Sequence, residues 1–227
     1  MQYSKLSNLK ILFFIPRRCK GHTEILSSVD VLSYTSMNAE DFVEFFISYQ
    51  KKVLTKDTIL ELCTSIVDRL KVTEFVMNVN FLLPVDRLSS TLEESISFNL
   101  DCKYSFVYSK GISTLSMKID CPVRINHIST LKGNLTFQIS NPSPNIYFED
   151  LLDIVLKYGN VVIYPIIRTS DKKTLMKEID QGKPIDDYLN FIRVAAIHKN
   201  LSDSGGLVSV SFVDLYNSYD IEKGVTW

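Results

Sequence analysis

The stretch that decides the fold runs from residue 146 to residue 196 and opens with IYFEDLLDIV (146–155). This decapeptide predicts a helix whose first turn holds Glu149, where unpaired N–H groups and the positive end of the helix dipole favour a carboxylate. The apolar run VVIYPIIR (161–168) follows and predicts a buried strand. A second helix is predicted over 184–196. The stretch therefore reads as helix, buried strand, helix.

Working back along the chain, apolar and polar residues alternate in several segments, and this period of two predicts strands with one wetted face. The segments are 73–83, 95–109, 112–119 and 134–139. The second and third of them are joined at Lys110-Gly111, which is typical of a hairpin turn.

The first seventy residues predict two strands and two helices. Residues 1–20 are expected to form an edge strand or arm, and 25–35 a strand. Helical spacing of apolar residues then predicts helices over 38–50 and 56–70, with Asn38 and Thr55 as their N-caps.

Adding a last strand over 207–214, the order of elements indicates an α+β fold with an antiparallel sheet and helices packed on one face. The first and second parts of the chain resemble each other in pattern. We therefore expect one bimodular domain spanning 1–227, with approximate halves 1–110 and 111–227.

Composition limits the function classes. The chain of 227 residues is 45% apolar and 22% charged, as in ordinary globular proteins. Its net charge of −1 argues against a nucleic-acid partner. No apolar run reaches the roughly 18 residues that a membrane span requires, so no membrane partner is expected. The four cysteines show no CxxC spacing, and no secretory signal is recognisable, so we expect a cytoplasmic protein with reduced thiols.

Three residues could hold a metal. Cys121, His127 and Glu149 would supply a thiolate, an imidazole and a carboxylate, and an open fourth position would make such a site catalytic. The alternative reading is a buried thiol, a turn histidine and a helix-start glutamate with no common role.

His22 precedes a predicted strand and could bind an anion or act as a general acid or base. The alternative is an ordinary residue at a strand end. The chain carries no glycine-rich phosphate loop, no HExxH motif and no serine-hydrolase order of residues, so those classes are set aside.

Several of these segments together resemble one family. The helix over 146–155, the strand YPIIR (164–168) and the Asp171-Lys172-Lys173 loop are similar to the C-terminal part of the type IB GTP cyclohydrolases and the related archaeal metal-dependent GTP cyclohydrolase. His22-Thr23 looks like the family's Gln-His-Thr, and Cys121-Pro122 resembles the start of its Cys-Pro-Cys motif. The likeness covers most of residues 20–215 and is dense only in 146–196.

The resemblance implies a tunnelling fold (T-fold) and an enzyme of pterin and folate biosynthesis that hydrolyses the imidazole ring of GTP. It implies a divalent metal (Zn or Fe) and a ring-like, tetramer-like homo-oligomer. Carried over residue by residue, Cys121 and Glu149 would be metal ligands, with His127 as the substitute third ligand. His22 would be catalytic in the substrate site, and Asn217 would bind substrate.

The chain also departs from the family pattern. Val123 replaces the second cysteine, and Val162 stands where the family has its purine-anchoring glutamate. Tyr216 and Ser218 replace the two histidines around Asn217. Two hypotheses follow from the resemblance, beside a third in which the chain is an unrelated α+β protein and the matches are accidental. One is a diverged paralogue with weak or no ring-opening activity, which binds GTP or another purine- or pterin-like molecule. The other is an active enzyme with a rebuilt Cys/His/Glu metal site forming a dihydroneopterin product.

Overall fold

The computed structural model describes residues 3–19, 21–34, 38–88, 95–125, 132–157, 159–161, 183–201, 206–214 and 223–226. Within these ranges the strands are β1 (Ser4–Arg17), β2 (Gly21–Ser33), β3 (Glu74–Leu88), β4 (Ser95–Ser109), β5 (Ile112–Ile125), β6 (Lys132–Ser140), β7 (Gly159–Val161), β8 (Val208–Asp214) and β9 (Lys223–Thr226). The helices described are α1 (Ala39–Ser48), α2 (Lys56–Leu70), α3 (Phe148–Leu156) and α5 (Lys183–His198).

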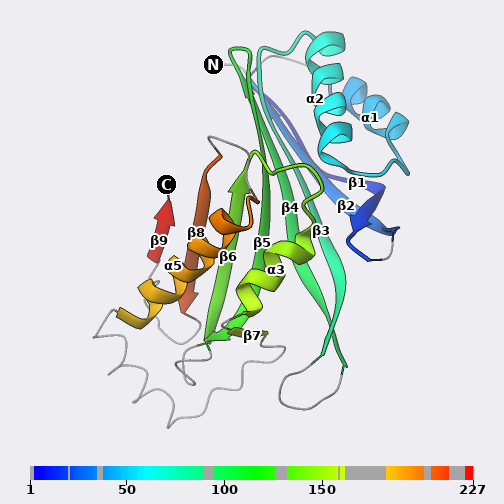
Figure 1. Ribbon diagram of the computed structural model, residues 1–227. Coiled ribbons are helices and arrows are strands. Elements are labelled where there is room, and N and C mark those ends of the chain that lie inside the picture. The colour runs from blue at the N-terminus through cyan, green and yellow to red at the C-terminus, as the bar shows by residue number, and fades with distance from the viewer. Residues whose placement is uncertain are drawn as a thin grey trace.

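All described strands belong to one antiparallel sheet, whose order is β1-β2-β3-β4-β5-β6-β8-β9, with β7 beside β5. The helices lie in two groups, α1 with α2 and α3 with α5 (Figure 1). The predicted α+β class and antiparallel sheet are confirmed. In the described residues each half of the chain, β1 to β4 and β5 to β9, has two strands, two helices and two strands in this order, and the second half adds the short strand β7 between its two helices.

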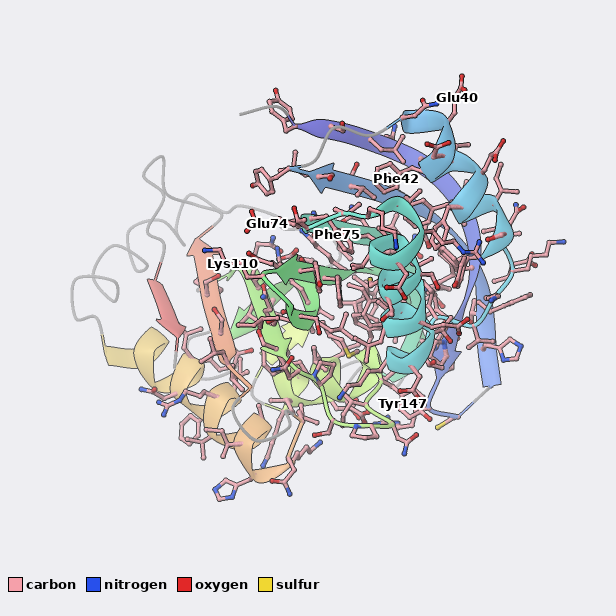
Figure 2. All side chains as sticks on the ribbon, turned by 90° about the horizontal axis from the view of Figure 1, so that it is seen from above. Glu40, Phe42, Glu74, Phe75, Lys110 and Tyr147 are labelled. Carbon is pink, nitrogen blue, oxygen red and sulfur yellow. The ribbon has the colours of Figure 1, made fainter. Side chains whose placement is uncertain are left out.

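One face of the sheet is buried from β2 to β8. Along one row across the strands, each residue is the register partner of the next, and all of these residues are buried. They are Val29, Val79, Tyr104, Met117, Ile139 and Val208, each between 0% and 6% exposed. The helices supply the other side of this core, and Phe42 of α1 and Phe75 of β3 lie between the helices and the sheet (Figure 2). The core is a single cluster that runs through both groups of helices.

The helix caps follow the prediction. Asn38 Oδ1 accepts a hydrogen bond from Glu40 N at 3.2 Å, and Thr55 Oγ1 accepts one from Thr58 N at 3.2 Å. Both bonds satisfy N–H groups that the first helical turn leaves unpaired. The predicted strand over 161–168 and the loop over 171–173 fall outside the described residues, apart from Val161 at the end of β7.

The outer edge of β1 carries a short hydrogen-bonded segment. Lys51 N donates to Leu12 O at 2.7 Å, Phe14 N donates to Lys52 O at 3.0 Å, and Leu54 N donates to Phe14 O at 2.8 Å. The segment joining α1 to α2 therefore covers this part of an edge strand that would otherwise offer its backbone to another chain.

The sheet divides beyond the pair Asp101 and Asp120, the last register partners of β4 and β5. From there β4 stays with β3 as far as Ser95, while β5 pairs with β7 through Val123. The two halves of the sheet separate at this end (Figure 1). None of the helices in the described ranges is long and apolar enough to span a membrane.

The face away from the helices carries polar side chains in cross-strand rows, with like charges at Asp101 and Asp120. Burial raises the pKa of Asp101, and the charge of Asp120 raises it further, against Lys118, which lowers it. The ionised form of Asp101 is therefore disfavoured in the folded state, and Asp101→Asn is expected to raise the free energy of unfolding at pH 7 by about 0.2–1 kcal/mol.

Urea unfolding as a function of pH tests this prediction. The gain should be complete above the raised pKa and should decline as the pH falls from there to the ordinary value of 3.8, below which Asp101 is protonated in both the folded and the unfolded parent chain. Asp68→Asn on the exposed side of α2 makes the same charge change and should leave stability nearly unchanged. An equal gain in both variants would point to net charge instead of the Asp101–Asp120 pair.

Candidate functional site

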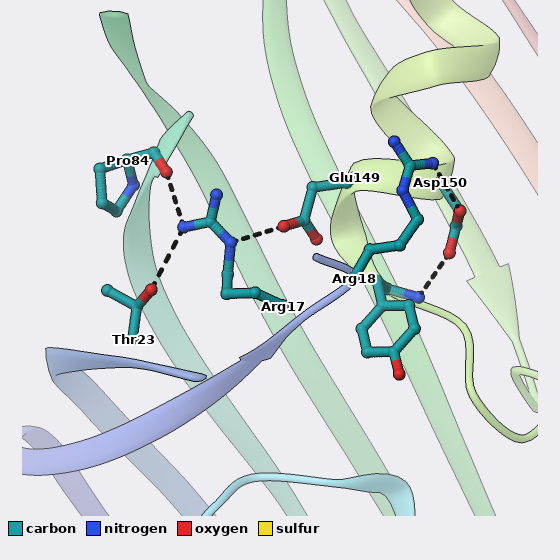
Figure 3. A network of polar contacts seen from close by, with 7 residues as sticks. Arg17, Arg18, Thr23, Pro84, Glu149 and Asp150 are labelled. Carbon is teal, nitrogen blue, oxygen red and sulfur yellow. Dashed lines mark hydrogen bonds and ion pairs between the residues drawn. The ribbon is translucent and has the colours of Figure 1, made fainter. Parts of the chain in front are cut away.

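A network of polar contacts on the helix side of the sheet lies where the end of β1 meets the start of α3. Arg17 Nε donates to Glu149 Oε1 at 2.5 Å, across 132 positions of the chain (Figure 3). Arg17 Nη1 also donates to Pro84 O at 2.8 Å and to Thr23 Oγ1 at 3.3 Å. Phe13 and Ile15 point to the buried face of β1. Because side chains alternate along a strand, Arg17 points to the same face and therefore toward α3.

A second ion pair lies beside the first. Arg18 Nη1 contacts Asp153 Oδ2 at 2.5 Å and Asp150 Oδ1 at 3.1 Å. Asp150 Oδ2 accepts from Tyr147 N at 2.9 Å, which caps α3 (Figure 3). The hydrogen bond to Asp153 is the main cause that raises the pKa of Arg18. Because Arg18 is 36% exposed, solvent screens this pair and its contribution to stability is small.

Two cysteines lie on the buried face where β4 and β5 separate. Cys121 is 0% exposed, and burial raises its pKa to about 12. Burial also raises the pKa of Cys102, and the charges of Asp101, Glu149 and Cys121 raise it further. Cys102 is the register partner of Ile119, two residues before Cys121 on β5, so the two thiols lie on the same buried face of neighbouring strands.

His22 lies elsewhere. It is exposed on β2, and its ring meets that of Phe14 edge-on at 5.1 Å. Its neighbour Thr23 faces Arg17, and successive strand residues point to opposite faces, so His22 is on the face away from Glu149. His127 and Asn217 lie outside the described residues.

The residues described do not suit a divalent metal. No group of three or more His, Cys, Asp or Glu side chains within the described ranges is arranged to hold one. In addition, Glu149 Oε1 is already bound by a guanidinium at 2.5 Å. A second cation about 4 Å from that charge is repelled by roughly 4 kcal/mol per unit charge at an effective dielectric constant of about 20.

Arg17 was not predicted as a member of the site. The sequence offered one signal, the basic pair Arg17-Arg18, which is separated from His22-Thr23 by three residues, together with the acidic residues that open the helix at Glu149. Pairing across 132 positions depends on the sheet order, which single-sequence patterns do not provide.

A cavity of about 290 Å³ adjoins this network between the start of α2 and the segment before α3. Its floor includes Tyr104 and Met117 of the sheet, and Pro16 and Tyr147 line it on the side of the Arg17 network. Lys56 Nζ donates to Pro142 O at 2.7 Å and so connects α2 with the segment before α3. The volume is close to the lower end of the range for small-molecule sites.

Comparison with known proteins adds no family to these observations. No family model matches this chain. No curated protein matches it either.

Proposed function

We propose that this chain is a tunnelling-fold paralogue of the type IB GTP cyclohydrolases that binds a purine- or pterin-like molecule without opening its ring. The observation that carries the proposal is the contact of Arg17 with Glu149. The carboxylate to which the resemblance assigns a metal is occupied by a guanidinium, so a metal-bound hydroxide has no place beside it.

The element order supports the tunnelling fold. Strand–strand–helix–helix–strand–strand occurs once over β1 to β4. The second half has the same order over β5, β6, α3, α5, β8 and β9, with the additional short strand β7 between α3 and α5. Both halves share one continuous antiparallel sheet with a single core, as a bimodular domain divided near Lys110 requires.

Metal content and product formation test the proposal. We expect the purified protein to contain substoichiometric zinc and iron by mass spectrometry, and incubation with GTP followed by oxidation to give no pterin fluorescence. A GTP-dependent fluorescent pterin would overturn the proposal and favour the active enzyme with ligands Cys121, His127 and Glu149.

Assembly and location are part of the same proposal. The edge strands β1 and β9 favour a homo-oligomer, and the resemblance favours a tetramer-like one. The location that we propose is the cytoplasm. Light scattering after size-exclusion chromatography should give a mass several times that of the 26.0 kDa chain. A clean monomer at micromolar concentration would contradict the oligomer.

A further inference from the structure

The cavity between the start of α2 and the segment before α3 is lined by two charged residues of opposite sign. They are Lys56 and Asp57 in the first turn of α2, and the other described residues that line the cavity are uncharged. Neither Arg17 nor Glu149 lines it, so the cavity is separate from that ion pair. A cation and an anion on one wall match a ligand that carries both charges, and they disfavour a ligand with several charges of one sign.

Lys56 is held in place at this wall. Its side chain is half-buried, and Nζ donates to Pro142 O at 2.7 Å. This bond uses one of the three N–H donors of the ammonium group, which forms its strongest hydrogen bonds with carboxylates and other anions. Asp57 is exposed, and its carboxylate can only accept hydrogen bonds. Lys56 therefore suits a ligand carboxylate, and Asp57 suits a ligand ammonium group.

The rest of the lining suits a flat apolar group. Tyr104 and Met117 form the floor, and both are almost fully buried. The ring of Tyr104 meets that of Phe148 edge-on at 4.9 Å, which fixes its orientation. Tyr147 and three prolines also line the cavity, and an aromatic ring packs well against such walls. The volume of about 290 Å³ indicates a small ligand with a single ring system.

We infer that this cavity is a binding site for a free aromatic α-amino acid. The Lys56 ammonium group binds the carboxylate of the ligand, the Asp57 carboxylate binds its ammonium group, and its ring packs against Tyr147 and the floor. Both halves of the chain contribute to the site, because α2 belongs to the first half and residues 142–147 belong to the second. The inference goes beyond the proposed function, since this ligand is neither a purine nor a pterin.

Isothermal titration calorimetry with L-phenylalanine tests the inference, and two half-ligands serve as controls. Phenylacetate lacks the ammonium group, and phenethylamine lacks the carboxylate. We expect L-phenylalanine to bind the parent chain with one-to-one stoichiometry. Each half-ligand should bind about 10-fold more weakly, because it loses one charge-assisted hydrogen bond. Glycine carries both charges without a ring, and it should also bind more weakly because it leaves the apolar walls uncovered.

Four variants test the role of each charge. Lys56→Met should weaken the binding of L-phenylalanine about 10-fold, and Lys56→Arg, which retains the cation, should keep most of the affinity. In Asp57→Asn the ammonium group of the ligand loses its partner, so L-phenylalanine and phenylacetate should bind equally well. A residue with only a structural role would not change this ratio. Lys10→Met removes an exposed cation of β1 and should bind like the parent chain.

Three results would overturn the inference. They are no binding of L-phenylalanine by the parent chain at millimolar concentration, half-ligands that bind the parent chain as tightly as L-phenylalanine, and folded Lys56→Met and Asp57→Asn variants that bind like Lys10→Met. Circular dichroism shows whether each variant is folded, and if Lys56→Met does not fold, Asp57→Asn and the half-ligands still decide the question. Pterin formed from GTP would overturn the proposed function and leave this inference unaffected.

Discussion

Replacing Phe148 with alanine is expected to lower the free energy of unfolding by about 3–5 kcal/mol. Phe148 is 1% exposed, and its ring meets those of Tyr104 at 4.9 Å and Phe81 at 5.3 Å, both edge-on. The truncation removes these contacts and leaves a cavity where α3 meets the sheet. Urea unfolding followed by circular dichroism measures the loss.

Phe148→Leu is the matched control, because it retains most of the buried volume and should cost clearly less than the alanine variant. Phe148 is also the first residue of α3, one position before Glu149. The alanine variant should therefore loosen Glu149 as well as the core. Equal losses in the leucine and alanine variants would show that the aromatic contacts, and not the filled volume, determine stability here.

Phe75→Ala and Phe137→Ala are each expected to cost about 3–5 kcal/mol and to lower Tm by about 6–20 °C within one cooperative transition. Phe75 lies on β3 and Phe137 on β6, one in each half of the chain, and both are 0% exposed. The core continues between them through Tyr104 and Met117, which are register partners. Neither half therefore has a core that can remain folded alone.

Calorimetry of both single variants and the double variant tests this expectation. The two losses should add, since the sites share no direct contact. Two separate transitions, of which each variant lowers only one, would show that the halves unfold independently.

Helices and their caps could be predicted closely, because the signals are local. The structure places α2 at Lys56–Leu70, as the spacing of its apolar residues and the Thr55 cap predict. The helically spaced aromatic residues Phe42, Phe45 and Phe46 of α1 and its C-cap Tyr49 are buried. Both results depend on residues within one or two turns of each other.

Strand ends were predicted less well, and prolines explain the difference. The predicted strands stop at Leu83 and Ile119, but β3 continues through Pro84 to Leu88, and β5 through Pro122 to Ile125. A strand tolerates proline where it lacks a neighbour. Pro84 lies beyond the last β2 partner of β3, and Pro122 lies where β5 has left β4 and has not yet reached β7.

The candidate site was predictable only in part. Acidic residues in the first turn of a helix identified Glu149, whereas Cys121 was singled out by its likeness to the start of a Cys-Pro-Cys motif and lies beyond the predicted strand end at Ile119. Arg17 was missed because the pairing of β1 with α3 is a property of the whole sheet. His22 lies on the other face because side chains alternate along β2. The residues at 21–24 alone do not show to which face each of them points.

The hydrogen-bonded segment on the outer edge of β1 restricts how another copy of this protein can pair with that strand. With the 51–54 segment hydrogen-bonded between Leu12 and Phe14, a strand added from a neighbouring molecule can extend only along Ser4–Ile11 before it meets that segment. The segment therefore limits the length over which two subunits can pair along the outer edge of β1.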